Sequence, residues 1–233
     1  MKKVKHIVVT RLAIKWRFKE TKLSWEDWVN NSLELMDSIC RPSLKNQSNK
    51  NFTLLSIVDE SVKEYGNVLD NEIVLKVPTL KDNEFPKEFV VDVINNYIKE
   101  FNEYDSIILS RLDRDDAIRF DFIDNVQKHL SNKVDTYIDI NNSLSYNYLT
   151  KDIYKSKKYF NTFVSPFVSV HEKINNKKIK CISLIFDHST LSKHLKGKKV
   201  NNLYAMQVIH EYNLLNKVQG DKININLKDY GIL

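Results

Sequence analysis

The chain has 233 residues, of which 42% are hydrophobic and 28% are charged. This length suits one α/β domain, and the hydrophobic fraction is sufficient for a packed core. No apolar run approaches the roughly 20 residues that span a bilayer, and the first apolar stretch is too short for a signal peptide. We therefore expect a single cytoplasmic domain over residues 1–233.

The net charge of +6 is distributed unevenly along the chain. Residues 51–150 contain 10 Lys and Arg against 19 Asp and Glu, whereas residues 151–233 contain 15 against 6. A basic end could face nucleic acid, an anionic membrane or a phosphorylated substrate, or it could be an ordinary solvated lysine surface. An acidic centre between basic flanks also suits a cation site that receives a diphosphate.

Short apolar runs alternate with segments of helical spacing in the first 130 residues, and Phe89 is expected on the buried face of its helix. Strands are predicted over 4–10, 52–58, 73–77 and 106–110, and helices over 24–40, 86–103 and 117–130. Arg41 and Pro42 are expected to interrupt the helix that precedes them. This order predicts an α/β fold with a mostly parallel sheet and helices on both faces.

The pattern becomes β-rich from about residue 134. Strands are predicted over 134–140, 163–170 and 181–186, and an apolar run over 203–209 leads to His210. Residues 175–178 are typical of a hairpin turn, and Asp187 is typical of a helix N-cap. No linker separates the halves, so we expect residues 1–130 and 131–233 to form two halves of one domain.

The strongest chemical signal is the acidic cluster Asp113, Asp115 and Asp116, which follows a predicted strand. Carboxylates this close repel one another, and keeping them all ionised normally requires a cation. Carboxylate oxygens suit Mg²⁺ or Mn²⁺, which usually bind one or two carboxylates together with substrate phosphates. A charged loop that caps the next helix is the alternative, and this segment alone does not decide between the two.

Polar residues also follow two other predicted strands, at Thr10-Arg11 and at Asp59. Ligands of parallel α/β sheets bind beyond the carboxyl ends of the strands. We therefore expect these residues and the acidic cluster to share one pocket.

Several motifs resemble those of GT-A glycosyltransferases. They are the Ser43-Leu44 turn with Gln47, an exposed Asn51-Phe52 pair, a strand that delivers Asp59, and Asp113-Arg114-Asp115 in the place of the Asp-x-Asp motif. Four further segments are similar to the rhamnosyltransferase family, namely 25–47, 111–118, Ser165-Pro166-Phe167 and 206–213. The family pattern has a glycine after the histidine, where this chain has Glu211.

The resemblance implies a metal-dependent glycosyltransferase of cell-surface polysaccharide synthesis, with Mn²⁺ or Mg²⁺ as cofactor. The donor would be a dTDP- or UDP-sugar, with L-rhamnose as one candidate sugar, and the acceptor a glycan or lipid-linked molecule. The implied metal ligands are Asp113, Asp115 and His210, and the implied donor-binding residues are Thr10, Arg11, Asp59, Arg111 and Asp113. If the reaction inverts the anomeric centre, the candidate bases are Asp187, Glu172 and Glu211.

Purely structural roles are the alternatives for several of these residues. His210 could be an ordinary hydrogen-bonded histidine at a strand end, Asp187 a plain N-cap, and Arg111 a partner of the acidic cluster instead of a phosphate ligand. Trp25 and Trp28 have helical spacing, which favours packing over stacking on a sugar.

Two rival functions are weaker. A nucleotidyltransferase could use the same acidic cluster, but it usually has a glycine-rich phosphate loop, and the four glycines lie elsewhere. A basic nucleic-acid-binding module over residues 151–199 would leave the acidic cluster unexplained. We expect no nucleic acid, and we assign the basic region to an anionic acceptor or to peripheral contact with an anionic membrane.

Overall fold

The computed structural model describes residues 3–15, 21–79, 87–101, 103–130, 133–155, 164–185, 188–213, 218 and 220–232. In these residues the strands form one mixed sheet with the order β10-β7-β6-β8-β4-β1-β2-β3, and β9 joins β5 to β6. The strands are β1 (Val4–Ala13), β2 (Thr53–Asp59), β3 (Glu72–Val77), β4 (Ser106–Arg111), β5 (Ala117–Ile118), β6 (Thr136–Asn147), β7 (Ile153–Lys155), β8 (Ser169–Lys173), β9 (Lys196–Ile209) and β10 (Asp221–Ile223).

The helices differ in kind as well as in length. The α-helices are α1 (Trp25–Leu35), α2 (Arg41–Lys45), α3 (Lys87–Ile98), α4 (Phe122–Leu130) and α5 (Ile182–Ile185). A π-helical turn η2 (Met36–Cys40) joins α1 to α2, and two 3₁₀ helices are η3 (His188–Lys193) and η4 (Leu227–Tyr230). In the described parts of the chain, no helix combines the length and apolar character that a membrane crossing needs.

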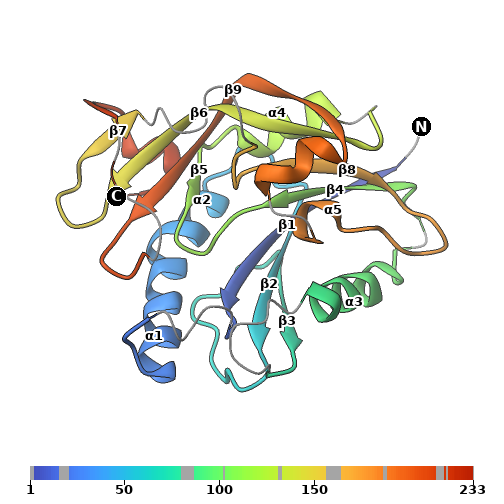
Figure 1. The fold of residues 1–233 in the computed structure, drawn as a ribbon, viewed down its shortest axis with the longest axis horizontal. Coiled ribbons are helices and arrows are strands. Elements are labelled where there is room, and N and C mark those ends of the chain that lie inside the picture. The colour runs from blue at the N-terminus through green and yellow to red at the C-terminus, as the bar shows by residue number, and fades with distance from the viewer. Residues whose placement is uncertain are drawn as a thin grey trace.

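The first half of the chain forms parallel strands between two helical layers (Figure 1). Successive side chains of a strand point to opposite faces, so each buried strand supplies both cores. Val8 and Ile108 pack in the core that contains α4 residues, whereas Ile7 and Ile107 pack with α3 residues. This arrangement confirms the predicted α/β fold with helices on both faces.

The strand order reverses at β1, which has β2 on one side and β4 on the other. Ligands of open α/β sheets bind outside the carboxyl ends of the strands at such a reversal. The register places Val9 opposite Arg111. The residues that follow, Arg11 on β1 and Asp113 after β4, therefore emerge at the same edge.

The second half extends the sheet with β8, β6 and β7, each antiparallel to its neighbour. The long strand β9 runs parallel to β6, and the two lie side by side across the top of the view (Figure 1). The short strand β5 pairs antiparallel with β9. Most paired residues still belong to parallel ladders, so the predicted sheet character is confirmed.

Residues 181–185 do not form the strand predicted over 181–186, and Phe186 lies outside the described residues. The hairpin turn is present, with Asn176 and Lys177 at positive φ and mutual backbone hydrogen bonds between Asn175 and Lys178. Cys181 then adopts a left-handed conformation with φ 53°, and the short helix α5 follows. A left-handed residue turns the chain out of the extended conformation, so the second arm of the hairpin leaves the sheet.

The helix prediction for residues 117–130 is wrong at its start. Ala117 and Ile118 pair with β9, and α4 begins only at Phe122. Pairing with a strand distant in the sequence overrides local helical spacing, because it satisfies backbone groups that the helix would otherwise use.

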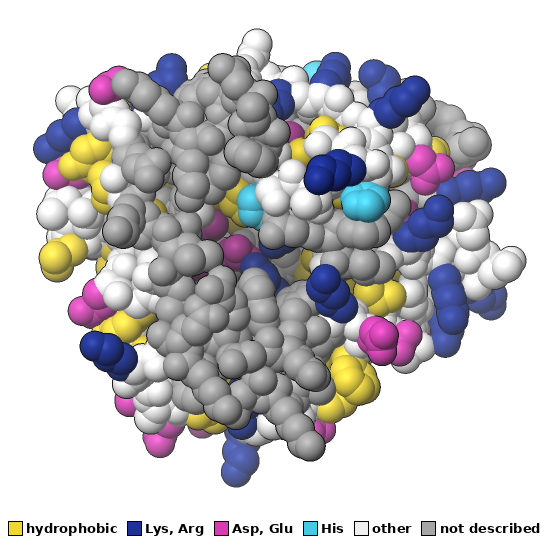
Figure 2. Space-filling view, viewed as in Figure 1, with side chains coloured by type: hydrophobic (Ala, Val, Ile, Leu, Met, Phe, Trp, Pro, Cys, Tyr) yellow, Lys and Arg dark blue, Asp and Glu magenta, His cyan; other side chains and the backbone are white. Residues whose placement is uncertain are grey.

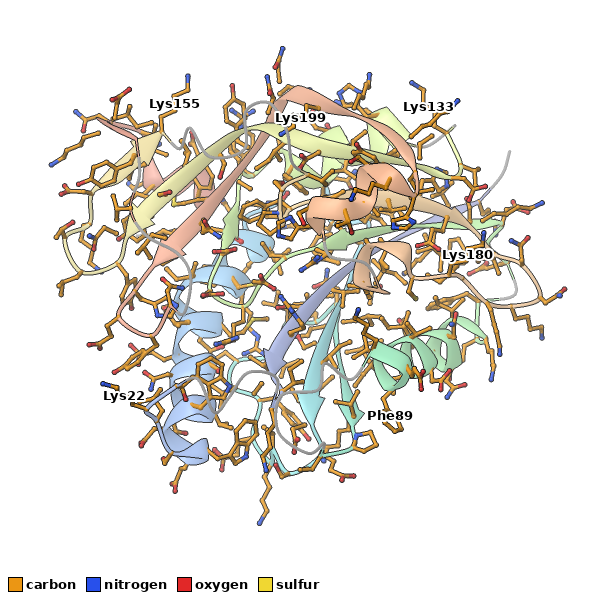
Figure 3. The ribbon with its side chains drawn as sticks, viewed as in Figure 1. Lys22, Phe89, Lys133, Lys155, Lys180 and Lys199 are labelled. Atoms are coloured by element: carbon orange, nitrogen blue, oxygen red, sulfur yellow. The ribbon has the colours of Figure 1, made fainter. Side chains whose placement is uncertain are left out.

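Two other helices also differ from the prediction. The helical run does not stop at Pro42, because the π-helical turn leads directly into α2, where a proline is tolerated in the first turn. The next helix, α3, ends at Ile98, and Pro86 lies outside the described residues. Phe89 is 44% exposed and points away from the sheet, which corrects its assignment to the core (Figure 3).

Candidate active site

The ends of β1 and β4 are joined by an ion pair. Arg11 Nη2 lies 2.6 Å from Asp113 Oδ1, as the parallel register of these two strands requires. Both side chains keep access to solvent, with exposed fractions of 18% and 32%. An accessible ion pair of this kind stabilises a fold little, and its arginine can exchange a carboxylate for a phosphate.

Asp113 is held in the ionised form by the basic residues around it. Burial raises the pKa of this carboxyl, but the positive charges of Arg11 and Arg111, with a smaller contribution from Arg114, hold it at about 2. Asp113 is therefore a carboxylate at neutral pH, balanced by guanidinium groups that can also attract an anion.

Asp115 is in contact with the end of β9. His210 Nε2 lies 3.0 Å from Asp115 Oδ2, and the side-chain amide nitrogen of Asn213 lies 3.3 Å from the same oxygen. The antiparallel pairing of β5 with β9 brings these residues, which are almost one hundred positions apart in the sequence, to one edge. The side chains of Asp115 and His210 are 14% and 6% exposed.

Asp116 has a different environment. It is 3% exposed, and its Oδ1 accepts a hydrogen bond of 3.0 Å from the backbone N–H of Val208. Burial, followed by the negative charges of Asp115 and Asp113, raises the pKa of Asp116 well above its usual value. Asp116 therefore ties the acidic loop to β9, and it does not cap α4.

Arg114 lies between the two aspartates and stacks on α1. Its guanidinium carbon is 4.4 Å from the centre of the Trp28 ring, and Trp28 is buried. Within the described chain, Arg114 Nε has no hydrogen-bond partner although it is enclosed. Trp28 is thus a packing residue, as expected, and its ring contacts the acidic loop through Arg114.

The remaining donor-binding candidates lie toward the carboxyl edge. Contrary to the prediction, β1 continues to Ala13, so Thr10 and Arg11 lie within the strand and do not follow it. Thr10 is 1% exposed, and its hydroxyl has no hydrogen-bond partner among the residues that the structure describes. Arg111 is half-buried and donates to the Ser183 carbonyl at 3.4 Å. Asp59 ends β2, and its Oδ1 accepts from the Ser61 and Thr79 hydroxyls at 2.5 and 2.6 Å.

Parts of the motif around residues 42–61 have structural roles. Phe52 is 4% exposed, which corrects the expectation of an exposed Asn51-Phe52 pair. The Gln47 amide donates to the carbonyls of Ser43 and Arg119 and accepts from the backbone of α4. These residues fix helices beside the site.

The Ser165-Pro166-Phe167 motif is also structural. The buried carboxylate of Asp139 accepts hydrogen bonds from the backbone and hydroxyl of Ser165. Lys199 Nζ lies 3.5 Å from the same carboxylate. These contacts fix the segment before β8, whose Val168 carbonyl accepts from the backbone N–H of Arg111 at 3.1 Å.

The structure does not bring Glu172 to this edge. Glu172 lies opposite Ile107, at the amino end of β4, and it is 2% exposed. Its carboxylate accepts a hydrogen bond of 2.9 Å from the backbone of Lys180. It lines a cavity of about 160 Å³ at the opposite end of β4 from Asp113. Antiparallel pairing of β8 with β4 causes this placement.

The other two candidate bases are Asp187 and Glu211. Asp187 lies outside the described residues. Glu211 is exposed and directly follows His210.

Acidic and basic side chains meet near the middle of one face, where the surface is hollowed (Figure 2). Among the described residues, no group of three His, Cys, Asp or Glu side chains converges as a metal site. Asp115 and His210 do converge, while Asp113 faces Arg11. Asp115 and His210, with Asp113 nearby in the same loop, are therefore the residues here that could hold a divalent cation.

Sequence reasoning missed Asn213 as a site residue. It lies three positions after His210 and contacts both His210 and Asp115. The available signal was an asparagine just after a candidate ligand at a strand end, where its side chain can hold a turn.

Comparison with known proteins gives a family match. The model of a family described as "Putative rhamnosyl transferase" matches residues 16–221. No curated protein matches the chain.

Three solved structures are similar at low identity. A putative nucleotide-diphospho-sugar transferase from Desulfovibrio desulfuricans G20 is 7% identical over 89% of this chain and 82% of that one, with a TM-score of 0.40. A 4-diphosphocytidyl-2C-methyl-D-erythritol synthase is 8% identical over 85% of this chain and 89% of that one, with a TM-score of 0.40. S. aureus TarS 1–349 in complex with UDP-GlcNAc is 11% identical over 91% of this chain and 60% of that one, with a TM-score of 0.44. The family match carries the assignment, and these likenesses add no argument to it.

Proposed function

Since the chain belongs to the rhamnosyl transferase family and is a glycosyltransferase, we propose that it catalyses metal-assisted sugar transfer from a dTDP- or UDP-sugar. L-rhamnose is the first candidate sugar. The acceptor would be a glycan or a lipid-linked molecule of cell-surface polysaccharide synthesis. In this reaction the bond from the anomeric carbon to the diphosphate breaks, and a bond from that carbon to an acceptor hydroxyl oxygen forms.

The observation that carries the proposal is the Arg11–Asp113 pair at the point where the strand order reverses. A diphosphate at this edge would meet Arg11 and Arg111, whose guanidinium groups match the geometry of phosphate oxygens. Arg11 would then exchange Asp113 for the phosphate, and the released carboxylate would face the same ligand. The exposed fractions of 18% and 32% support such an exchange, because neither side chain is locked in the core.

Asp115 and His210 are the residues that would hold Mn²⁺ or Mg²⁺, with Asp113 as a further ligand. When bound, the cation would neutralise charge on the leaving diphosphate. His210 lies 3.0 Å from Asp115, so both can reach one ion with little movement. Arg114 adds a fixed positive charge beside both aspartates, held by its stacking on Trp28.

A base would take the proton of the acceptor hydroxyl if the reaction inverts the anomeric centre. Asp187 stays our first candidate, and Glu211 is the second because it adjoins His210 in the chain. Glu172 has no part in the proposal, since it lies at the opposite end of β4.

A hairpin beside the site supports an acceptor attached to lipid. The backbone N–H of Tyr148, after β6, donates a 2.9 Å hydrogen bond to the carbonyl of Ile209, the residue before His210. Leu149 at the tip is 87% exposed, and Lys151 Nζ lies 4.0 Å from the centre of the Tyr148 ring. An exposed leucine beside a tyrosine and a lysine suits the boundary of an anionic bilayer.

Vesicle flotation tests this hairpin. Leu149→Ser should weaken binding to vesicles of phosphatidylglycerol several-fold, whereas Val68→Ser, at a 45% exposed valine before β3, should leave it unchanged. Equal flotation of both variants would contradict the assignment.

Donor hydrolysis tests the proposed reaction. The protein should hydrolyse one of dTDP-, UDP- or GDP-sugars only when Mn²⁺ or Mg²⁺ is present. Asp115→Ala should lower turnover by about 100-fold or more without unfolding the protein. Asp124→Ala removes a carboxylate from the surface of α4 and serves as the matched control. Turnover that is independent of metal, or full activity of Asp115→Ala, would refute the proposal.

A further inference from the structure

The sheet ends at β3, which pairs with β2 along one of its two sides. The carbonyls of Asn71 and Val77 accept backbone hydrogen bonds from the β2 side. Backbone groups of a strand alternate in direction, so Val74 and Lys76 direct their N–H and C=O groups away from β2. In the described residues no strand pairs with this outer side. An edge with unpaired backbone groups readily pairs with a strand of another chain.

Apolar side chains are exposed beside this edge. Ile73 is 36% exposed, and Phe89, near the start of α3, is 44% exposed. Leu75 shares a face of β3 with Ile73, and it packs partly buried against the core that contains α3 residues. Of the five large hydrophobic side chains that are exposed in the described residues, two therefore lie on the α3 side of this edge. Burial against another surface would remove them from water.

The opposite face of β3 carries an exposed charge. Lys76 is exposed, with its Nζ 5.8 Å from the centre of the Tyr65 ring. Asp70, which is half-buried, precedes the strand. An antiparallel copy of β3 reverses this order, so Lys76 of each copy approaches Asp70 of the other. A lysine on an edge strand discourages pairing in general, and a carboxylate at the matching position makes one partner favourable.

We propose that β3 pairs antiparallel with β3 of a second copy of this chain, about a two-fold axis at Val74, so that the two sheets become continuous. In this register Val74 lies opposite its own copy, and Ile73 lies opposite Leu75 of the partner subunit. Both copies of α3 then cover the same face of the joined sheet. Each contact occurs twice because the interface is two-fold symmetric. This assembly goes beyond the proposed reaction and does not depend on it.

The edge is short, since β3 has six residues. A stable interface normally buries more than about 1,000 Å², so we expect a weak dimer that forms at micromolar concentrations. Sedimentation velocity between about 5 and 500 µM should show the sedimentation coefficient rising from that of a monomer toward that of a dimer. Wild type that stays monomeric over this range would overturn the proposal.

Ile73→Lys tests the apolar contact. It places like charges on both copies at the interface, so association should weaken about tenfold or more. Leu149→Lys makes the same kind of change at another exposed side chain, on the hairpin after β6, and should leave association unchanged. Circular dichroism establishes that both variants are folded. Equal association of the two variants would place the interface elsewhere.

A charge exchange tests the partner and the direction of pairing. Lys76→Asp and Asp70→Lys should each weaken association about threefold to tenfold, because like charges then face each other. The double variant restores opposite charges and should regain the affinity of wild type. Asp124→Lys, on the surface of α4, is the control for charge reversal. A double variant that associates no better than the single variants would overturn the antiparallel register.

Hydrogen exchange locates the interface without any substitution. The backbone amides of Val74 and Lys76 should exchange several-fold more slowly at high protein concentration than at low concentration, because the dimer gives them acceptors. The amides at the tip of the hairpin after β6 should exchange at the same rate in both samples. A dimer in which Val74 and Lys76 are not protected would contradict pairing through β3.

Discussion

Two charged clusters of this chain contain similar side chains but differ in how deeply these are buried. In the first, Arg41 is 2% exposed and donates twice to Glu72, at 2.8 and 2.7 Å, and once to Asp37 at 2.5 Å. Glu72 also accepts from Ser56 and from the backbone of Leu69. This cluster joins α2 to β3, and its side chains form hydrogen bonds with other residues of the protein.

The second cluster, at the carboxyl edge of β1 and β4, is more accessible to solvent. Arg11 Nη2 lies 2.6 Å from Asp113 Oδ1, and these two side chains are 18% and 32% exposed. Asp115 is held by His210 and Asn213, while Arg114 Nε lacks a partner in the described part of the chain. The comparison indicates that the first cluster stabilises the fold and that the second is accessible to the proposed ligand.

The largest expected effect is on stability, from Arg41→Met. Removing the arginine leaves Glu72 buried without its partner, which costs about 3–5 kcal/mol of the free energy of unfolding. Urea unfolding measures this loss. Lys128→Met, which breaks the exposed pair with Asp124, should change stability by less than about 1 kcal/mol. A similarly small change in Arg41→Met would contradict the structural role of the first cluster.

The same type of substitution should act differently at Arg11. Arg11→Met breaks an accessible pair, so the free energy of unfolding should change by less than about 1 kcal/mol. The affinity for a nucleoside diphosphate should fall about tenfold or more, because a charge-assisted hydrogen bond to phosphate is lost. Isothermal titration with UDP and dTDP measures this effect. Unchanged affinity together with a large loss of stability would reverse the assignments of the two clusters.

A smaller effect concerns the pH dependence of stability. Burial and the charges of Asp115 and Asp113 raise the pKa of Asp116, so the folded protein keeps this proton to higher pH than the unfolded chain. The stabilisation is complete below the unfolded pKa and is lost as pH rises through the folded pKa. Asp116→Asn removes this titration and retains an oxygen for Val208.

In the presence of a chelator, the stability of Asp116→Asn relative to wild type should therefore increase as pH rises above about 4. The slope should not exceed about 1.4 kcal/mol per pH unit. Unfolding curves recorded from pH 4 to pH 8 measure it. A constant difference between the two proteins would show that Asp116 titrates normally.

The fold of the first half could be predicted from the sequence because β1, β2 and β4 are apolar runs buried on both faces. The second half was harder, since its strands depend on pairing between distant segments. Seven residues of β9, from Lys196 to Asn202, precede the apolar run that marked the strand, and five of them are lysine or asparagine. They form a strand because β6 supplies a parallel partner along its length.

The same limit applies to the site. Motif spacing grouped Asp113 and Asp115, because both lie in one loop after a buried strand. Glu172 lies at the amino end of β4 because β8 runs antiparallel to β4. The local sequence does not indicate the direction in which β8 runs. Asn213 was missed because its importance comes from contacts with His210 and Asp115 in a turn.

A crystal structure with Mn²⁺ and a nucleoside diphosphate tests the central claim most directly. The anomalous signal of manganese should lie between Asp115 and His210, and Arg11 should have left Asp113 to contact a phosphate oxygen. Manganese and diphosphate bound elsewhere, with the Arg11–Asp113 pair intact, would contradict the account.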